Sequence, residues 1–230
     1  MKYRTKKKRI HQQWTTKKKR EANRKLCQRY PFLIPRRWND LPSWSWYKDK
    51  AYSWTVADWM ETGWWKAFGL LMCEDLREDL IACGHLYDFR IEDMKEKWGR
   101  LDIFCSLPEG SNAWDIIEDY SALSERICVK CGRPDSYMLN WNGWLSPYCK
   151  ECFDEIERRN TKYYKSRKPH DYQKCIPEGI SNLLADKRSI IRTTKDGSER
   201  IEFDLMEKAN RIRARWRILH GEDGNNTGNN

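Results

Sequence analysis

Apolar residues recur at spacings of three and four over residues 64–83, which predicts an amphipathic helix. Its expected buried stripe consists of Trp65, Phe68, Met72, Leu76, Leu80 and Cys83. Gly84 follows at the position where helices commonly end in a left-handed residue. The opposite face is acidic, which is typical of a solvated surface, and carries Glu74, Asp75, Glu78 and Asp79.

The pattern changes to a period of two over residues 88–107, which predicts a β-hairpin that turns at Trp98-Gly99-Arg100. A second amphipathic helix is expected after Ser111, a candidate N-cap. Its predicted stripe consists of Ala113, Ile116, Tyr120, Leu123 and Ile127. This helix leads directly to Cys128, so we expect the cysteine-rich segment to be attached to the preceding domain without a linker.

Four cysteines follow the spacing C-x2-C-x17-C-x2-C and are Cys128, Cys131, Cys149 and Cys152. Two intervening residues allow both sulfurs of a pair to reach one ion, and a seventeen-residue insert is long enough for a hairpin. The spacing predicts one structural Zn²⁺ ion. Because four thiolates leave no position for water, we do not expect this zinc to be catalytic.

The order of elements around these cysteines predicts a treble-clef-like or ribbon-like module. Cys131-Gly132 forms the expected knuckle, Asn142-Gly143 the tip of a hairpin, and Cys149 the start of a helix. We expect basic side chains near the ligands to offset the negative charge of the thiolates. These are Lys130, Arg133 and Lys150.

The other cysteines have no ligand spacing and are interpreted as small buried hydrophobes. They are Cys27, Cys73, Cys83, Cys105 and Cys175. Nine cysteines without a recognisable signal peptide indicate a reducing compartment, and no run of residues is apolar enough to cross a membrane. We therefore expect a soluble protein of the cytoplasm.

Charge is distributed unevenly along the chain, whose net charge is +10. Residues 1–37 contain 15 Lys or Arg and a single acid, whereas residues 38–127 contain 9 basic and 18 acidic residues. The basic positions form two matching clusters, Lys6, Lys7, Lys8 and Arg9, and Lys17, Lys18, Lys19 and Arg20. Matching positions of the two clusters are eleven residues apart, so an induced helix would place both clusters on one face. The arm is either a disordered solubility tail or a segment that contacts phosphate.

Tryptophan is abundant, and its role is open at two places. Residues 30–66 hold seven tryptophans, which either build a core poor in aliphatic residues or present a surface that stacks on bases or a partner. Trp141 and Trp144 flank the predicted hairpin tip. They either pack on the knuckle or project as a recognition edge.

These observations predict an α+β fold: a small mixed helix and β-hairpin domain with an attached four-cysteine zinc module. After the cysteines we expect a basic connector, a hairpin that pairs residues 189–194 with 199–205, and a final helix whose arginines are spread around its axis. The expected segments are a disordered basic arm (1–29), a Trp-rich domain (30–127), the zinc module (128–160), a C-terminal part (161–220) and a disordered tail (221–230).

Several stretches resemble small hypothetical proteins encoded by phages and prophages of gut bacteria. The stretches are Asn23 to Pro35, Gly63 to Gly69, Met94 to Leu101, Ser124 to Arg126 and Gly143 to Cys149. The resemblance covers about residues 23–153. It implies a phage or prophage context and the cytoplasm of a bacterial host.

Two functions are compatible with the sequence. The first is binding of DNA or RNA through the basic arm, supported by the zinc module and the aromatic content. The second is a protein-directed phage factor, for example an inhibitor of a host defence or nucleic-acid-handling complex. It would act by binding a host protein or ribonucleoprotein complex, for which the acidic residues 38–127 are suited. An enzyme is disfavoured because the four histidines, His11, His85, His170 and His220, do not cluster with a nucleophile or a carboxylate pair.

Overall fold

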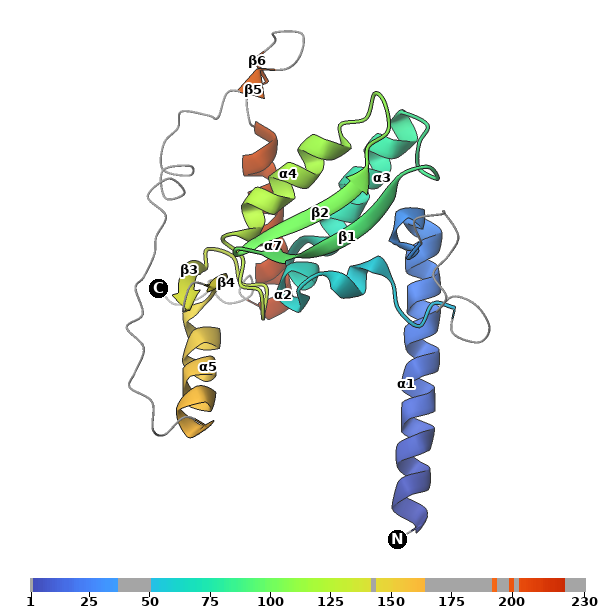
Figure 1. Cartoon of the computed structure of the whole chain (residues 1–230), viewed down its shortest axis with the longest axis vertical. Helices are drawn as coiled ribbons and strands as arrows, with labels where there is room; N and C mark the ends of the chain where they lie inside the picture. The colour runs from blue at the N-terminus through green and yellow to red at the C-terminus, as the bar shows by residue number, and fades with distance from the viewer. Residues whose placement is uncertain are drawn as a thin grey trace, which may run out of the picture. The chain divides into compact units, whose positions relative to one another are not determined.

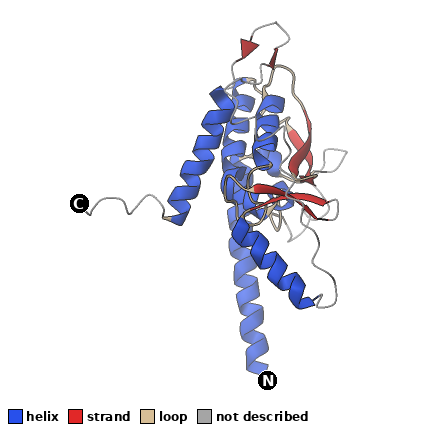
Figure 2. Ribbon diagram, turned by 90° about the vertical axis from the view of Figure 1, so that its left-hand side faces the viewer, coloured by secondary structure: helices blue, strands red, loops and turns tan. Residues whose placement is uncertain are grey.

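The computed structural model describes residues 2–36, 51–141, 144–163, 192–193, 199–200 and 203–221. These residues form helices and small two-stranded antiparallel sheets (Figures 1 and 2). The mixed α and β character predicted from the periodicities is therefore confirmed. In this part of the chain, no helix has both the length and the apolar character that spanning a bilayer requires.

The helices follow the predicted order, with one long addition at the start. They are α1 (Lys2–Arg29), α2 (Thr62–Trp64), α3 (Leu70–Ala82), α4 (Ala113–Ser124), α5 (Lys150–Tyr163) and α7 (Phe203–His220). Two short 3-10 turns are η1 (Pro31–Leu33) and η3 (Val56–Trp59). The basic arm, expected to be disordered, is helical as α1 (Figure 1).

The strands of the described residues pair into three two-stranded sheets. They are β1 (Arg90–Lys97) with β2 (Arg100–Ser106), β3 (Tyr137–Trp141) with β4 (Trp144–Tyr148), and β5 (Arg192–Thr193) with β6 (Glu199–Arg200). The first turns at Trp98 and Gly99, which both have positive φ, 56° and 81°. A two-residue turn with positive φ at both positions has a backbone twist that matches the twist of the flanking strands. The predicted hairpin at residues 88–107 is therefore confirmed, whereas β6 ends earlier than expected and α7 begins at Phe203.

The predicted helix over residues 64–83 is interrupted by a π-helical segment, η4 (Trp65–Gly69). A π segment adds a residue to one turn and shifts the side chains that follow it. As a result Trp64 is fully buried and Trp65 only partly so, although the stripe was predicted to begin at Trp65. Trp65 lies so close to Gly69 that a Cβ there would come within 2.2 Å of the indole ring.

The chain divides into two compact units, neither of which is continuous in sequence. Unit 1 comprises residues 1–60, 70–95 and 102–117, and unit 2 comprises residues 61–69, 96–101 and 118–230. The core of unit 1 is aliphatic and aromatic, and its fully buried side chains include Leu33, Val56, Met72, Leu76 and Leu80. Phe32 and Phe89 make an edge-to-face contact in it, with ring centroids 5.6 Å apart.

Unit 2 has a smaller core around α4 and α7. Tyr120 is fully buried and stacks on Phe68, while Ile212 of α7 is 1% exposed. Lys208 donates to Asp119 over 2.6 Å, which attaches α7 to α4. On α4, Ile117, which belongs to unit 1, is buried in place of the predicted Ile116, which is only partly buried.

Candidate metal centre

The first cysteine pair lies on a tight backbone turn that follows α4. The N–H of Gly132 donates to the carbonyl of Cys128 over 2.9 Å, and the N–H of Cys128 donates to the carbonyl of Arg133 over 2.9 Å. Gly132 has φ +91°, a conformation that other residues rarely adopt. The N–H of Arg133 also points at the sulfur of Cys131, 3.4 Å away. This is the knuckle predicted at Cys131-Gly132.

The second pair is delivered by the β3–β4 hairpin and the start of α5. Tyr137 pairs with Tyr148 and Trp141 with Trp144, so the strand that leaves the knuckle returns to it. Cys149 directly follows β4, and its carbonyl accepts the N–H of Phe153 in the first turn of α5. Cys152 lies in the same turn. The order of knuckle, hairpin and helix therefore agrees with the sequence prediction.

The four sulfurs converge on one point. The ligand atoms of Cys128, Cys131, Cys149 and Cys152 all lie within 4.8 Å of one another, and the sulfurs of Cys131 and Cys149 are 3.6 Å apart. Four sulfurs held tetrahedrally at about 2.3 Å from a zinc ion would be about 3.8 Å apart. The donor set is therefore compatible with one metal ion.

The thiols of the cluster differ in acidity. Burial raises the pKa of Cys149 to about 12 and also raises the pKa of Cys152. Burial acts in the same direction on Cys128, but backbone N–H groups of Cys131, Cys149 and Lys130 donate to its sulfur and lower its pKa overall. The pKa of Cys128 is thus shifted toward the thiolate form, and a bound cation would favour the thiolate form of all four cysteines.

The knuckle packs against the start of α2 at backbone distance. The N–H of Gly63 donates to the carbonyl of Val129 over 2.8 Å, and the buried indole N–H of Trp64 donates to the carbonyl of Ile127 over 2.8 Å. A Cβ on Gly63 would lie 2.1 Å from the carbonyl oxygen of Cys128. A Cβ on Gly132 would lie 2.5 Å from the carbonyl oxygen of Gly63. The metal centre is therefore built into unit 2, as expected from the absence of a linker before Cys128.

The basic residues beside the ligands are paired with carboxylates of α5. Lys130 pairs with Glu155, Arg133 with Glu151, and Lys150 with Asp154 over 2.7 Å. The first two contacts hold the knuckle against α5, whereas the third lies within α5. The prediction that the three cations offset the thiolate charge is thus modified, because each also serves a nearby carboxylate.

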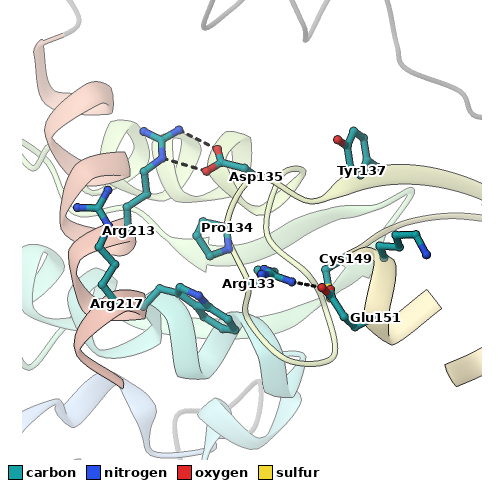
Figure 3. A pocket seen from close by; sticks show the side chains of 10 residues that line it. Arg133, Pro134, Asp135, Tyr137, Cys149, Glu151, Arg213 and Arg217 are labelled. Carbon is teal, nitrogen blue, oxygen red and sulfur yellow. Dashed lines mark hydrogen bonds and ion pairs between the residues drawn. The ribbon is translucent and has the colours of Figure 1, made fainter. Parts of the chain in front are cut away.

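A pocket of about 380 Å³ lies beside the second cysteine pair (Figure 3). It is lined by the segment that follows the knuckle, the first residues of α5 and one side of α7. Arg213 of α7 makes a two-pronged contact with Asp135, with nitrogen–oxygen distances of 3.2 and 2.8 Å (Figure 3). This contact lowers the pKa of Asp135, while partial burial opposes the shift.

Sequence reasoning missed the contribution of α7 to this region. The alternating arginines of α7 were interpreted as spread around the helix, which left no basic stripe. In the folded unit, Arg213 contacts Asp135 and Arg215 donates to the carbonyl of Lys66 over 3.1 Å. Trp216, a tryptophan within the arginine run, was the available signal that one side of this helix differs from a solvated basic surface.

The predicted nucleic-acid residues lie on α1. Lys17, Lys18 and Lys19 are exposed, and Lys19 pairs with Asp58 over 2.7 Å. Arg20 is partly buried. The side chains of Lys6, Lys7, Lys8 and Arg9 lie outside the described part of the structure. Both clusters therefore lie on α1. The contacts and burial of the side chains are described only for the second cluster, residues 17–20.

The aromatic candidates are described only in part. The side chains of Trp141 and Trp144 lie outside the described residues, as do Trp38, Trp44 and Trp46. Of the Trp-rich segment, Trp64 is core and Trp59 is 37% exposed. Among the remaining cysteines, Cys27 and Cys73 are buried as predicted, whereas Cys83 and Cys105 are partly exposed. Cys175 lies outside the described residues.

Comparisons of this chain with models of protein families, with curated proteins and with solved structures found no match.

Proposed function

We propose that this protein binds nucleic acid through the basic helix α1, on a body stabilised by one structural zinc ion. The zinc is held by Cys128, Cys131, Cys149 and Cys152 in a treble-clef-like module. The role is one of binding and not of catalysis, in the bacterial cell in which a phage or prophage is expressed. The supporting observation is that α1 is anchored at one end and carries its cations toward the other.

The anchored end of α1 is packed into unit 1. Asn23 and Cys27 are buried, and the amide of Asn23 donates to the carbonyl of Tyr52 over 2.9 Å. Arg29 contacts Glu74, which also accepts the hydroxyl of Tyr30 over 2.7 Å. These contacts fix the C-terminal third of the helix. The preceding residues are presented on a continuous helix.

The other end of α1 concentrates positive charge. Ten of the first twenty residues are Lys or Arg, and none of the twenty is Asp or Glu. Positions eleven apart lie nearly on the same side of a helix, so the two clusters would face one phosphate backbone together. Such contacts release counterions, which makes the affinity steeply dependent on salt.

The direct test removes residues 1–15, which leaves the packed end of α1 and its contact between Lys19 and Asp58 in place. Binding of fluorescent DNA and RNA is measured by anisotropy across a salt series. We expect the truncation to abolish most of the affinity, and each lost phosphate contact to flatten the logarithmic salt slope by about 0.9 on duplex DNA and about 0.7 on single strands. Zinc content and thermal stability should not change.

A matched pair of substitutions separates α1 from net charge. Neutralising the exposed Lys17 and Lys18 to glutamine should weaken binding and flatten the slope. Neutralising Lys95 and Lys97, both exposed on β1, makes the same change in net charge and should have little effect. Equal effects of the two pairs would mean that α1 is only a solubility segment.

A protein-directed role is the second candidate function, and exposed apolar side chains of unit 1 favour it. Tyr87 is 74% exposed, Phe104 66% and Trp114 53%. Together with the acidic excess of residues 38–127, they would suit a basic protein surface. Recovery of one stoichiometric protein from nuclease-treated host lysate, with no binding of DNA or RNA, would favour this function over the first.

A further inference from the structure

The pocket beside the metal centre is more basic than acidic. Four of its side chains are cationic and two are acidic. The cations come from three separate segments: Arg133 after the first cysteine pair, Lys150 at the start of α5, and Arg213 and Arg217 on α7. Its volume of about 380 Å³ lies within the range of about 300–1,000 Å³ that is usual for small-molecule sites.

Three of these cations are already engaged, and the fourth is not. Arg133 pairs with Glu151, Lys150 with Asp154, and Arg213 with Asp135. Arg217 is exposed and makes no hydrogen bond or ion pair with any residue in the described ranges. A guanidinium that faces a pocket without a partner is suited to a planar, two-pronged contact with a phosphate.

The pocket also has aromatic walls. Trp216 stacks on His220, with ring centroids 3.6 Å apart and an interplanar angle of 20°. This contact holds the indole of Trp216 where it lines the pocket. Tyr137, on β3, lies on the wall and is 51% exposed. Because every nucleobase has a flat face, such side chains bind bases with little regard to sequence.

The start of α5 forms another part of the pocket wall. Helix α5 is 14 residues long, and its first residues, Lys150 and Glu151, line the pocket. Free N–H groups at a helix start favour negative charge. Glu151 already takes advantage of this position through its contact with Arg133. The anion-stabilising place at the start of α5 is therefore held by a carboxylate of the protein itself, which leaves the phosphate to the cations of α7.

We propose that this pocket binds one nucleoside monophosphate unit, with the phosphate on Arg217 and the base against Trp216. The unit is an unpaired nucleotide of a bound single strand, so this proposal rests on the nucleic-acid binding proposed above. It extends that function by adding a preference for single strands. The α1 contacts supply affinity without selectivity, and the pocket requires a base that is free to leave its stack.

The test measures binding of AMP, adenosine and inorganic phosphate to the full chain by isothermal titration calorimetry. We expect AMP to bind more tightly than either fragment, since only AMP reaches both Arg217 and Trp216. Arg217→Gln should weaken AMP binding about tenfold or more, as expected for loss of a charge-assisted contact. Arg217 is exposed, so this substitution should leave the fold intact. Trp216→Phe keeps a stacking face and should retain most of the affinity.

The matched control is Arg158→Gln, which removes an exposed arginine of α5 that does not line the pocket. It should bind AMP as the native chain does. Failure of AMP to bind at millimolar concentration, equal binding of AMP and phosphate, or an unchanged affinity of Arg217→Gln would each overturn the proposal.

Strand competition separates this proposal from the proposed function. AMP should displace a single-stranded oligonucleotide partially and a duplex hardly at all. If the chain binds strands but not AMP, the pocket proposal fails and the function proposed for α1 stands. If the chain binds AMP through Arg217 but no strand, nucleic-acid binding fails and the pocket is a site for free nucleotides.

Discussion

Cysteine has opposite roles in unit 1 and in the metal centre of unit 2. In unit 1, burial raises the pKa of Cys27 to about 12 and raises that of Cys73 further, so both thiols stay protonated and pack as small hydrophobes. In the metal centre, backbone N–H groups turned toward Cys128 lower its pKa despite burial. Burial alone therefore does not decide the role of a cysteine. The convergence of four sulfurs within 4.8 Å of one another does, since burial raises the pKa of Cys149 and Cys152 in the cluster as well.

Unit 1 and the four-cysteine region of unit 2 also differ in how much buried apolar core stabilises them. Unit 1 is packed around fully buried aliphatic side chains such as Leu33, Leu76 and Leu80. The segment from Cys128 to Cys152 buries few large apolar side chains, of which Met138 is 8% exposed. For a region with so little core, the metal ion proposed above would supply much of the stability. Substitutions that affect one region and spare the other test this difference.

The largest expected effect is that of Cys149→Ser. It should release the metal and lower the free energy of unfolding of this region by about 5 kcal/mol or more, since structural zinc sites contribute about 10–16 kcal/mol. Hydrogen exchange read by mass spectrometry should show lost protection over residues 127–153 and retained protection over residues 70–94. The matched control, Cys73→Ala, should keep the metal and lose only stability in unit 1. Unchanged protection of residues 127–153 in Cys149→Ser would contradict the account.

The next effect is that of a methyl group at Gly63. Gly63→Ala places a Cβ against the carbonyl of Cys128 and should cost about 1–3 kcal/mol, the usual range for overpacking, or more if the knuckle cannot move. Gly84→Ala is the control, because Gly84 has φ +82° but open space around it. It should cost about 1 kcal/mol from backbone strain alone. Chemical denaturation measures both, and equal costs would show that the close approach at Gly63 does not matter.

An effect of similar size is expected at Trp64. Trp64→Phe keeps an aromatic ring but leaves the buried carbonyl of Ile127 without its donor, which should cost about 1–3 kcal/mol. Trp65→Phe, at the partly buried neighbour, should cost less. Denaturation curves of the two variants check this order, and the reverse order would mean that the π segment η4 does not set the register of the helix.

The smallest effect is a dependence on pH. The Arg213 contact holds the pKa of Asp135 below its usual value, so the contact stabilises the fold above the unfolded pKa of about 3.9 and is lost as pH falls through the folded pKa. Asp135 is 59% exposed, so solvent limits its contribution to about 1 kcal/mol or less. Asparagine tolerates the positive φ of Asp135, 57°. Asp135→Asn should therefore be less stable than the native chain at pH 7 and equally stable near pH 2; a constant difference would point to packing instead.

The features predictable from sequence were those that depend on local spacing. The spacing of Cys128, Cys131, Cys149 and Cys152 indicated one cluster, and the alternation on either side of Trp98 indicated a hairpin. Both depend on residues that are close in sequence or on a ligand geometry with few solutions. The structure brings the four cysteines together as expected, although the identity of the metal is still a prediction.

The features that could not be predicted depend on contacts between distant segments. Nothing in the local pattern shows that Gly63 meets the knuckle or that Arg213 meets Asp135. The π segment also escaped prediction, because the period of the apolar stripe is nearly the same with Trp64 or Trp65 at its start. The helical state of the basic arm depends in part on contacts such as that of Asn23 with Tyr52, which propensity does not reveal.

The most direct test of the central claim is the metal content of the purified chain in reducing buffer, measured by inductively coupled plasma mass spectrometry. The account predicts one equivalent of zinc per chain, and less than a tenth of an equivalent in Cys149→Ser. Cys73→Ala should match the native chain. A folded native chain without stoichiometric zinc, or with the same zinc content after Cys149→Ser, would contradict the claim that these four cysteines hold one structural zinc ion.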